Sequence, residues 1–196
     1  VFCVLDIAQS AGAVPVALSG WGAGFAVGAA VKYLCGGPGA CFLWTEKETA
    51  ARCAPIDVGW FSHAAPFDFD IHDFRYADSA ARYWGGTPSV APYAIATAGF
   101  EILAEAGVDA IYAHSQQLLS RLAGALPAGA FLSCMRDGAR GSAAIVRVRH
   151  VEAASAALAA ARILHDMRQG GIRVSMHLYT NEEDVDALAA ALAPHL

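Results

Sequence analysis

Asp6 and Lys32 are the residues whose types and spacing best support chemistry in this sequence. Asp6 directly follows the apolar run Phe2–Leu5, and residues 7–31, which separate it from Lys32, carry no charged side chain. A carboxylate can pair with a protonated pyridine nitrogen and keep the ring cationic, which makes the ring an electron sink. A lysine in a partly desolvated pocket can present a neutral amine that forms a Schiff base with an aldehyde. The pair therefore suggests a pyridoxal phosphate site.

Three predicted strands would bring these two residues together. The run Phe2–Leu5 is short, apolar and partly β-branched, which is typical of a strand buried on both faces of a parallel sheet. Gly24–Gly28 and Cys41–Thr45 have the pattern of two further strands, with Lys32 on the glycine-rich connection between them. Open α/β sheets bind ligands at the carboxyl ends of their strands. We therefore expect Asp6 and Lys32 to project from neighbouring strand ends.

The rest of the chain predicts loops and then a second α/β unit. Residues 54–88 lack periodicity and are rich in Pro, Asp, His and aromatic residues, which favours long ordered loops that carry function. Helical spacing of apolar residues over 90–126, interrupted by Gly107, predicts two helices. The remaining expected elements are strands at 130–134, 143–149 and 172–176, a helix at 151–167, and a final helix with a capping box at residues 180–183. The pattern predicts an α/β fold with domains at 1–106 and 107–196, the first ending in a bridging helix.

Composition excludes several classes of protein. The 196 residues are 56% hydrophobic and 16% charged, with a net charge of -5. A chain of this kind can bury a core, which argues against disorder. The negative charge argues against a binder of nucleic-acid phosphates. Five cysteines have no zinc-site spacing, and their odd number disfavours a disulfide framework, so we expect no metal site.

The uncharged stretch 7–31 is long enough to span a bilayer. It also contains Gln9, Pro15, serines and several glycines, so a glycine-rich loop followed by a buried strand explains it better. The amino terminus shows neither a basic region nor a cleavage pattern of a secretory signal. We therefore expect a cytoplasmic protein without a membrane span.

Five segments of the sequence resemble kynureninases, and they occur in the same order. They are residues 6–15, the segment around Lys32, Gly59–His63, Gly85–Pro88 and Gly171–Val174. Kynureninases belong to the class V aminotransferase branch of the fold-type-I pyridoxal phosphate enzymes. The resemblance implies part of the large-domain sheet of that fold plus its small carboxyl-terminal domain. Because family members are longer and this chain opens in mid-strand, it also implies that the chain is a carboxyl-terminal half.

The resemblance assigns five residues to the cofactor. Lys32 would be the Schiff-base lysine and catalytic residue, and Asp6 the partner of the pyridine nitrogen. Gln9 would lie near the phenolic oxygen, to which its amide can donate. Trp60 and Thr87 would donate to the phosphate across the interface of a homodimer with shared active sites. The alternatives without a cofactor are a structural role in the core for the aromatic ring of Trp60 and a role in a turn for Thr87.

Two further residues would contact the substrate. Arg173 matches the family arginine that binds the α-carboxylate, since a planar guanidinium makes two parallel hydrogen bonds to a carboxylate. A surface ion pair is the alternative for Arg173. His63 is a candidate substrate contact, with a hydrogen-bonded loop histidine as the alternative.

The resemblance implies a hydrolase that cleaves the Cβ–Cγ bond of kynurenine, or of a related γ-keto amino acid, to alanine and an aromatic acid. The expected context is tryptophan catabolism and NAD biosynthesis. Two residues depart from the family pattern: kynureninases usually have histidine at the position of Gln9 and tyrosine at that of Val31. These departures keep open another class V activity, namely an aminotransferase, desulfurase or lyase. A non-enzymatic alternative is an inactive fragment that folds and dimerises without cofactor.

Overall fold

The chain divides into two compact units. The computed structural model describes residues 2–136, 140–168 and 170–196. The first unit comprises Val1–Ala11 and Val16–Glu105, and the second comprises Gly12–Pro15 and Ala106–Leu196. The boundary predicted after residue 106 stays a prediction for the domains of the whole protein.

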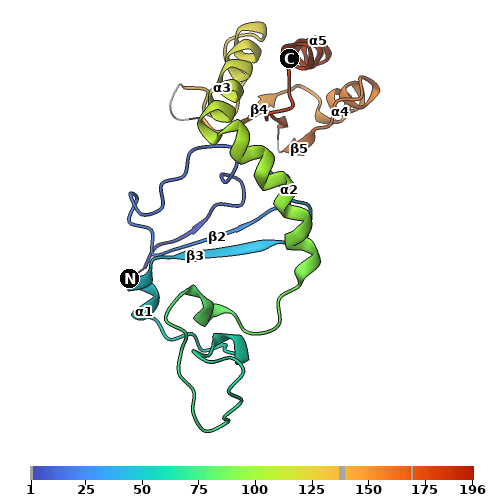
Figure 1. Cartoon of the computed structure of the whole chain (residues 1–196). Helices are drawn as coiled ribbons and strands as arrows, with labels where there is room; N and C mark the ends of the chain where they lie inside the picture. The colour runs from blue at the N-terminus through green and yellow to red at the C-terminus, as the bar shows by residue number, and fades with distance from the viewer. Residues whose placement is uncertain (1, 137–139, 169) are drawn as a thin grey trace. The chain divides into compact units, whose positions relative to one another are not determined.

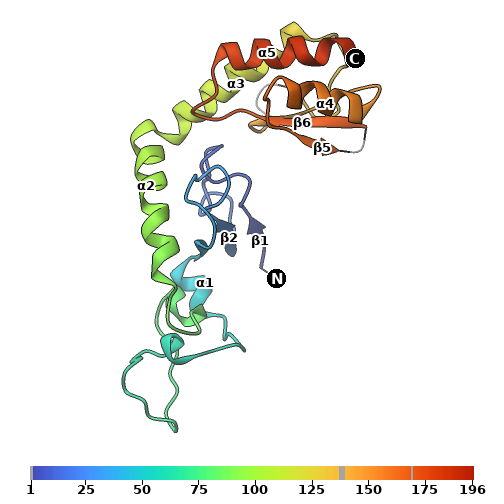
Figure 2. The ribbon, with the colours of Figure 1, turned by 90° about the vertical axis from the view of Figure 1, so that its right-hand side faces the viewer.

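The first unit contains a three-stranded sheet (Figures 1 and 2). Its strands are β1 (Val4–Asp6), β2 (Phe25–Ala29) and β3 (Cys41–Thr45), in the order β1-β2-β3. Strand β1 runs parallel to β2, and β3 runs antiparallel to it. All three predicted strands are present, with bounds that shift by one or two residues for the first two.

One expectation about β1 is wrong in this structure. The sequence pattern predicted a strand buried on both faces, yet Val4 is 61% exposed. The reason is that β1 lies at the edge of the sheet and, among the described residues, pairs only with β2.

Helix α2 (Val90–Ala106) lies against the connection that carries Lys32. A Cβ atom on Gly99 of this helix would lie 2.6 Å from the carbonyl oxygen of Cys35. A Cβ atom on Gly36 would lie 2.7 Å from Cβ of Ala30 and 2.8 Å from Cβ of Ala96. The backbone N–H of Ala30 donates to the carbonyl of Ala40 at 2.9 Å and closes the loop. Small residues therefore allow the helix and the loop to touch along their backbones.

A long segment with little regular structure separates β3 from α2. It contains helix α1 (Lys47–Ala51) and the short 3₁₀ turns η1 (Trp60–Ser62) and η2 (Ala80–Tyr83). The guanidinium of Arg82 is buried and donates to the carbonyls of Ala50, Cys53 and Ala77. Because one buried side chain satisfies three carbonyls, the segment is ordered without a sheet or a long helix. This agrees with the loops expected over residues 54–88.

The second unit packs helices on a three-stranded antiparallel sheet. Its elements are α3 (Val108–Ala125), β4 (Ala143–Arg147), α4 (Val151–Ala160), β5 (Asp166–Arg168), β6 (Gly171–Ser175), α5 (Glu182–Leu192) and η3 (Ala193–His195). The strand order is β4-β6-β5. Figure 2 shows α4 and α5 on one side of β5 and β6. Ala144 and Val146 of β4 and Ile172 and Val174 of β6 are buried in one cluster with apolar residues of these helices.

Three expectations for this unit need correction. The strand expected at 130–134 is a single bridge between Phe131 and Val146. The helix expected to reach residue 167 ends at Ala160, and residues 166–168 form strand β5 instead. The capping box of α5 was expected to begin at Thr180 but begins at Asn181. The hydroxyl of Thr180 instead accepts a hydrogen bond from the N–H of His177.

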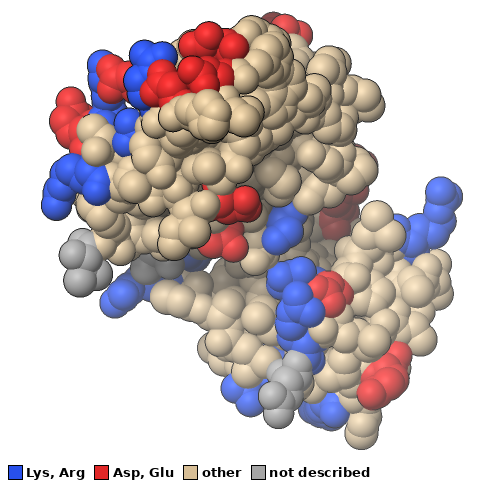
Figure 3. Space-filling model, turned by 90° about the horizontal axis from the view of Figure 1, so that it is seen from below, with Lys and Arg blue, Asp and Glu red and all other residues tan. Residues whose placement is uncertain are grey.

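Charged side chains are sparse on the face drawn in Figure 3, where uncharged residues predominate. This matches the charged content of 16%. Within the described residues, no helix is long and apolar enough to cross a membrane.

We predict that Gly99→Ala destabilises the first unit by about 1–3 kcal/mol, because the new methyl group must push the helix away from the backbone of Cys35. The matched control is Gly124→Ala in α3, where a Cβ atom would meet nothing within 4 Å. That control should be neutral or slightly stabilising. Urea unfolding followed by circular dichroism measures both, and equal midpoints for the two variants would contradict the close approach.

Candidate active site

Asp6 and Lys32 lie at the same end of the first sheet. Asp6 is the last residue of β1, and Lys32 follows Ala29, the last residue of the parallel strand β2. Strand β3 begins at this same end with Cys41, opposite Ala29. The parallel pairing of β1 and β2 therefore brings the two predicted site residues to neighbouring strand ends.

Asp6 borders an open hollow at this sheet end. One carboxylate oxygen, Oδ1, accepts a hydrogen bond from the backbone N–H of Ala8 at 2.9 Å. The side chain is exposed and lines a hollow of about 500 Å³ together with Ala8, Val27 and Leu43. No hydrogen bond to Oδ2 is found among the described residues. The carboxylate is thus fixed by one oxygen and can accept from a ligand with the other.

The amine of Lys32 has no acidic partner within the described part of the chain. Its side chain is exposed, so the described residues do not supply the desolvation expected from the sequence. Gln9 lies in the turn that follows β1 and is also exposed. The structure therefore groups Asp6, Gln9 and Lys32 within two adjacent turns.

Cys35 supports the Lys32 turn through its backbone. Its N–H donates to the carbonyl of Lys32 at 2.9 Å, and its φ is 52°. Partial burial raises the pKa of the Cys35 thiol. The structure thus gives Cys35 a part in the turn.

A second group forms where two glycine-containing segments meet. The backbone of Gly59 approaches that of Gly85 so closely that a Cβ atom on Gly59 would overlap the Gly85 carbonyl oxygen. The buried hydroxyl of Ser62 donates to the carbonyl of Trp84 at 2.8 Å and accepts from the N–H of Gly59 at 3.1 Å. The segments that carry Trp60 and Thr87 are therefore held together.

Trp60 belongs to an exposed aromatic cluster and not to a core. Its indole is 39% exposed and contacts Phe61, Phe67 and Phe69, with ring centroids 4.5–5.9 Å apart. Within the described residues, neither the indole N–H of Trp60 nor the hydroxyl of Thr87 has a hydrogen-bond partner. Two donors are thus available to an anionic group.

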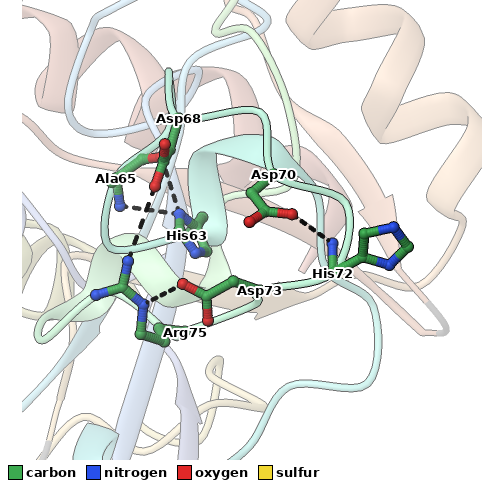
Figure 4. Close-up of polar contacts among 7 residues, drawn as sticks. All are labelled: His63, Ala65, Asp68, Asp70, His72, Asp73 and Arg75. Atoms are coloured by element: carbon green, nitrogen blue, oxygen red, sulfur yellow. Dashed lines mark hydrogen bonds and ion pairs between the residues drawn. The ribbon is translucent and has the colours of Figure 1, made fainter.

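His63 is 8% exposed and is held by its own loop (Figure 4). Its Nδ1 lies 2.8 Å from the carbonyl oxygen and 3.0 Å from the nitrogen of Ala65. Its Nε2 is buried without a hydrogen-bond partner among the described residues. His63 also borders a cavity of about 440 Å³ lined by Trp60, Phe69 and Phe74. The contacts of Nδ1 agree with a hydrogen-bonded loop histidine. Nε2 could form a hydrogen bond with a ligand.

The charged residues near His63 pair with one another. Arg75 contacts Asp73 at 2.8 Å and Asp68 at 3.9 Å, and Asp70 accepts from the backbone N–H of His72 (Figure 4). In the residues that the structure describes, no group of three or more His, Cys, Asp or Glu side chains is arranged to hold a metal ion. These contacts stabilise the loop itself.

The residues around Lys32 and the segment that carries Trp60 and His63 are attached to opposite ends of β2. Tyr83, which precedes Trp84, packs edge-on against Phe25, the first residue of β2, with ring centroids 5.5 Å apart. Lys32 follows the other end of the same strand, which spans ~13 Å. The segment between α1 and α2 extends away from the sheet in both ribbon views (Figures 1 and 2). Among the described residues, neither Trp60 nor His63 contacts Lys32.

Arg173 lies on β6 in the second unit. Its Nη2 atom is 2.7 Å from Oδ2 of Asp166, which is its direct neighbour on β5. Both residues border a cavity of about 580 Å³, together with His165 and Tyr179. The sequence predicted Arg173 but missed Asp166, because residues 151–167 were assigned to one helix. The signal of a strand there was the alternation of charged and apolar side chains over Asp166–Met167–Arg168.

A family model described as aminotransferase class-V matches residues 1–188. The chain therefore belongs to the class V aminotransferase family, within the fold-type-I pyridoxal phosphate enzymes. Among curated proteins, the uncharacterized aminotransferase YcbU of Bacillus subtilis (strain 168) is 28% identical over 191 residues, which cover 95% of this chain and 50% of that protein. The kynureninase of Deinococcus radiodurans is 32% identical over 200 residues, which cover 97% of this chain and 48% of that protein.

Solved structures show the same fold. The cysteine desulfurase of Thermococcus onnurineus NA1 has a TM-score of 0.84 at 20% identity, over 98% of this chain and 52% of that protein. The cystine C-S lyase C-DES has a TM-score of 0.78 at 22% identity, over 95% of this chain and 50% of that protein. The chain thus spans about half the length of the relatives that it matches. A further C-DES structure contains glycine covalently linked to the pyridoxal phosphate cofactor.

Pyridoxal phosphate is the cofactor of this family, and the residues of this chain fit it. Within the described residues, Oδ2 of Asp6 accepts no hydrogen bond and the amine of Lys32 has no acidic partner, which suits the protonated ring nitrogen and the aldehyde respectively. The side-chain donors of Trp60 and Thr87 are likewise without a partner there, which suits a phosphate group.

Ser62→Ala should lower the free energy of unfolding by about 1–3 kcal/mol, because the carbonyl of Trp84 and the N–H of Gly59 lose a buried partner. It should also change the near-ultraviolet circular dichroism of the tryptophans, which reports on aromatic packing. Ser19→Ala is the control, since Ser19 is exposed and its side chain has no hydrogen bond in the described residues. An unchanged spectrum and midpoint for Ser62→Ala would show that the two segments are held together in another way.

Proposed function

We propose that the chain forms part of a cytoplasmic, homodimeric pyridoxal phosphate hydrolase. Its reaction is cleavage of the Cβ–Cγ bond of kynurenine, or of a related γ-keto amino acid, to alanine and an aromatic acid. The observation that carries the cofactor assignment is the placement of Asp6 and Lys32 at one sheet end, each with an unpaired polar atom. The hydrolase assignment is supported by the kynureninase relatives and by the segment Gly59–His63.

The residues at the sheet end would hold the cofactor and move one proton. Oδ2 of Asp6 accepts the hydrogen bond of the ring nitrogen and keeps that nitrogen protonated. Nζ of Lys32 would hold the cofactor through its aldehyde and would accept the proton that leaves Cα of the substrate. The side-chain amide of Gln9 donates to the phenolic oxygen. When bound, the cofactor supplies an electron sink for the negative charge at Cα.

Arg173 and the aromatic loop would complete the site. The guanidinium of Arg173 binds the α-carboxylate through two parallel hydrogen bonds and so orients the bond to be broken. Trp60 and Thr87 donate to the cofactor phosphate of a second copy of the chain. The second copy is proposed because the aromatic loop is attached at the opposite end of β2 from Lys32. His63, with a buried and unpartnered Nε2, is proposed as a substrate contact.

The second candidate is another class V activity. Gln9 and Val31 depart from the kynureninase pattern, and a relative named as an aminotransferase matches over 95% of the chain. A desulfurase or lyase activity belongs to this same candidate. An inactive fragment that dimerises without cofactor is the non-enzymatic candidate, since the chain covers about half of each relative.

Borohydride reduction in the presence of limiting pyridoxal phosphate tests cofactor binding directly. The chain contains two lysines, Lys32 and Lys47, and Lys47 is paired with Asp78 at 3.0 Å. We expect one pyridoxyl group per chain, located on Lys32 by peptide mass spectrometry. Lys32→Ala should abolish the label, and Lys47→Ala should retain it. Equal labelling of both lysines, or none, would support the inactive fragment.

Product analysis of the cofactor-loaded protein separates the enzymatic candidates. With L-kynurenine we expect release of anthranilate and alanine in equal amounts, without a requirement for a keto acid. Anthranilate is followed by its fluorescence, and alanine by chromatography. Transfer of the amino group to pyruvate or glyoxylate without anthranilate would favour the aminotransferase.

A further inference from the structure

Arg173 pairs with a carboxylate on the open face of the second sheet. In the register of that sheet, Ile145 of β4 lies on one side of Arg173 and Asp166 of β5 on the other. These residues lie on the half-exposed face, while Ile172 and Val174 point into the core. The bond from Nη2 of Arg173 to Oδ2 of Asp166 is therefore a direct cross-strand contact.

Arg168 binds the same carboxylate from the edge strand. Its Nη2 lies 2.6 Å from Oδ2 of Asp166, and its Nη1 donates to Oδ1 at 2.9 Å. The residue opposite Arg168 on β6 is Gly171, which has no side chain, so Arg168 reaches along its own strand to Asp166. Two guanidiniums thus share one carboxylate, and the formal charges of these three groups sum to +1.

We propose that Asp166, backed by Arg168, is a positioning residue that holds the guanidinium of Arg173 ready for the substrate α-carboxylate. The proposal rests on the carboxylate-binding role proposed for Arg173. An arginine side chain has several rotatable bonds, and a partner that already fixes its planar head reduces the entropy lost when a second carboxylate binds.

Arg168 is needed because Asp166 alone would repel that carboxylate. Two carboxylates on one guanidinium are like charges at close range, which is unfavourable. The second guanidinium offsets the charge of Asp166 and leaves the cluster positive. Positioning and simple attraction therefore make opposite predictions for loss of the Asp166 charge: positioning predicts weaker carboxylate binding, and attraction predicts tighter binding.

The test compares two small amines on the cofactor-loaded protein. L-Alanine carries the α-carboxylate, and ethylamine lacks it. The dissociation constant of each is read from the absorbance of the bound cofactor. For Asp166→Asn we expect a dissociation constant for L-alanine that is about 3- to 10-fold higher, the size expected for freeing one arginine side chain. Ethylamine binding should stay unchanged, and Asp166→Glu should recover most of the loss.

Asp186→Asn is the matched control. Asp186 of α5 accepts two hydrogen bonds of 2.7 Å from Arg121 of α3, and these bonds hold its pKa below the usual range. The same change of charge and shape is thus made at another Arg–Asp pair of the second unit. We expect no change in the binding of either amine.

The outcomes separate the proposal from the function on which it rests. If Arg173→Gln leaves L-alanine binding unchanged, the role proposed for Arg173 is wrong. If Arg173→Gln weakens L-alanine binding while Asp166→Asn leaves it equal or tighter, only the positioning role is overturned. An Asp166→Asn effect that is equal for both amines, accompanied by a lower unfolding midpoint, would mean that Asp166 merely stabilises the sheet, which also overturns the proposal.

Discussion

The contact between α2 and the Lys32 connection is the constraint on which the candidate site depends. Gly99 of the helix lies against the backbone of Cys35, and Gly36 lies between Ala30 and Ala96. These contacts involve backbone atoms and methyl groups, so the loop cannot change its path without separating from the helix. The close packing explains how an exposed lysine on a glycine-rich connection is held beside the end of β1. It also explains why this region needs so many small residues.

Local sequence patterns predicted the elements whose signals are themselves local. Strand β3 and the start of α2 match the expected bounds, because apolar periodicity and flanking glycines specify them. The end of α4 was missed for a physical reason. The N–H of Ile163 bonds the carbonyl of Leu158, and Arg162 takes a φ of 60° where such a helix end usually has glycine. Without that glycine, the alanine-rich pattern gave no stop signal, and β5 was hidden with it.

In the candidate site, too, some residues could be predicted from the sequence pattern around them, and others matter only through contacts with residues far apart in the sequence. Asp6 and Lys32 could be predicted as a pair, because parallel strands bring their carboxyl ends to one edge. Asp166 could not, since its importance comes from pairing with Arg173 across two strands that only the folded sheet defines. The joining of the Trp60 and Thr87 segments through Gly59 and Gly85 also depends on contacts between residues far apart in the sequence. The family resemblance supplied those residues, and the fold supplies the reason that they act together.

The arrangement also explains why this chain identifies a cofactor better than a substrate. The contacts proposed for the residues at the sheet end are with parts of pyridoxal phosphate that every reaction of the family shares, namely the ring nitrogen, the aldehyde and the phenolic oxygen. Discrimination between substrates instead requires groups that contact the substrate side chain. In this chain the candidate for such a contact is His63, whose loop is attached at the opposite end of β2 from Lys32. If a second copy supplies that loop, the chemistry of each site comes from one chain and part of its selectivity from the other. Changes in the aromatic loop could then alter substrate choice without disturbing the lysine.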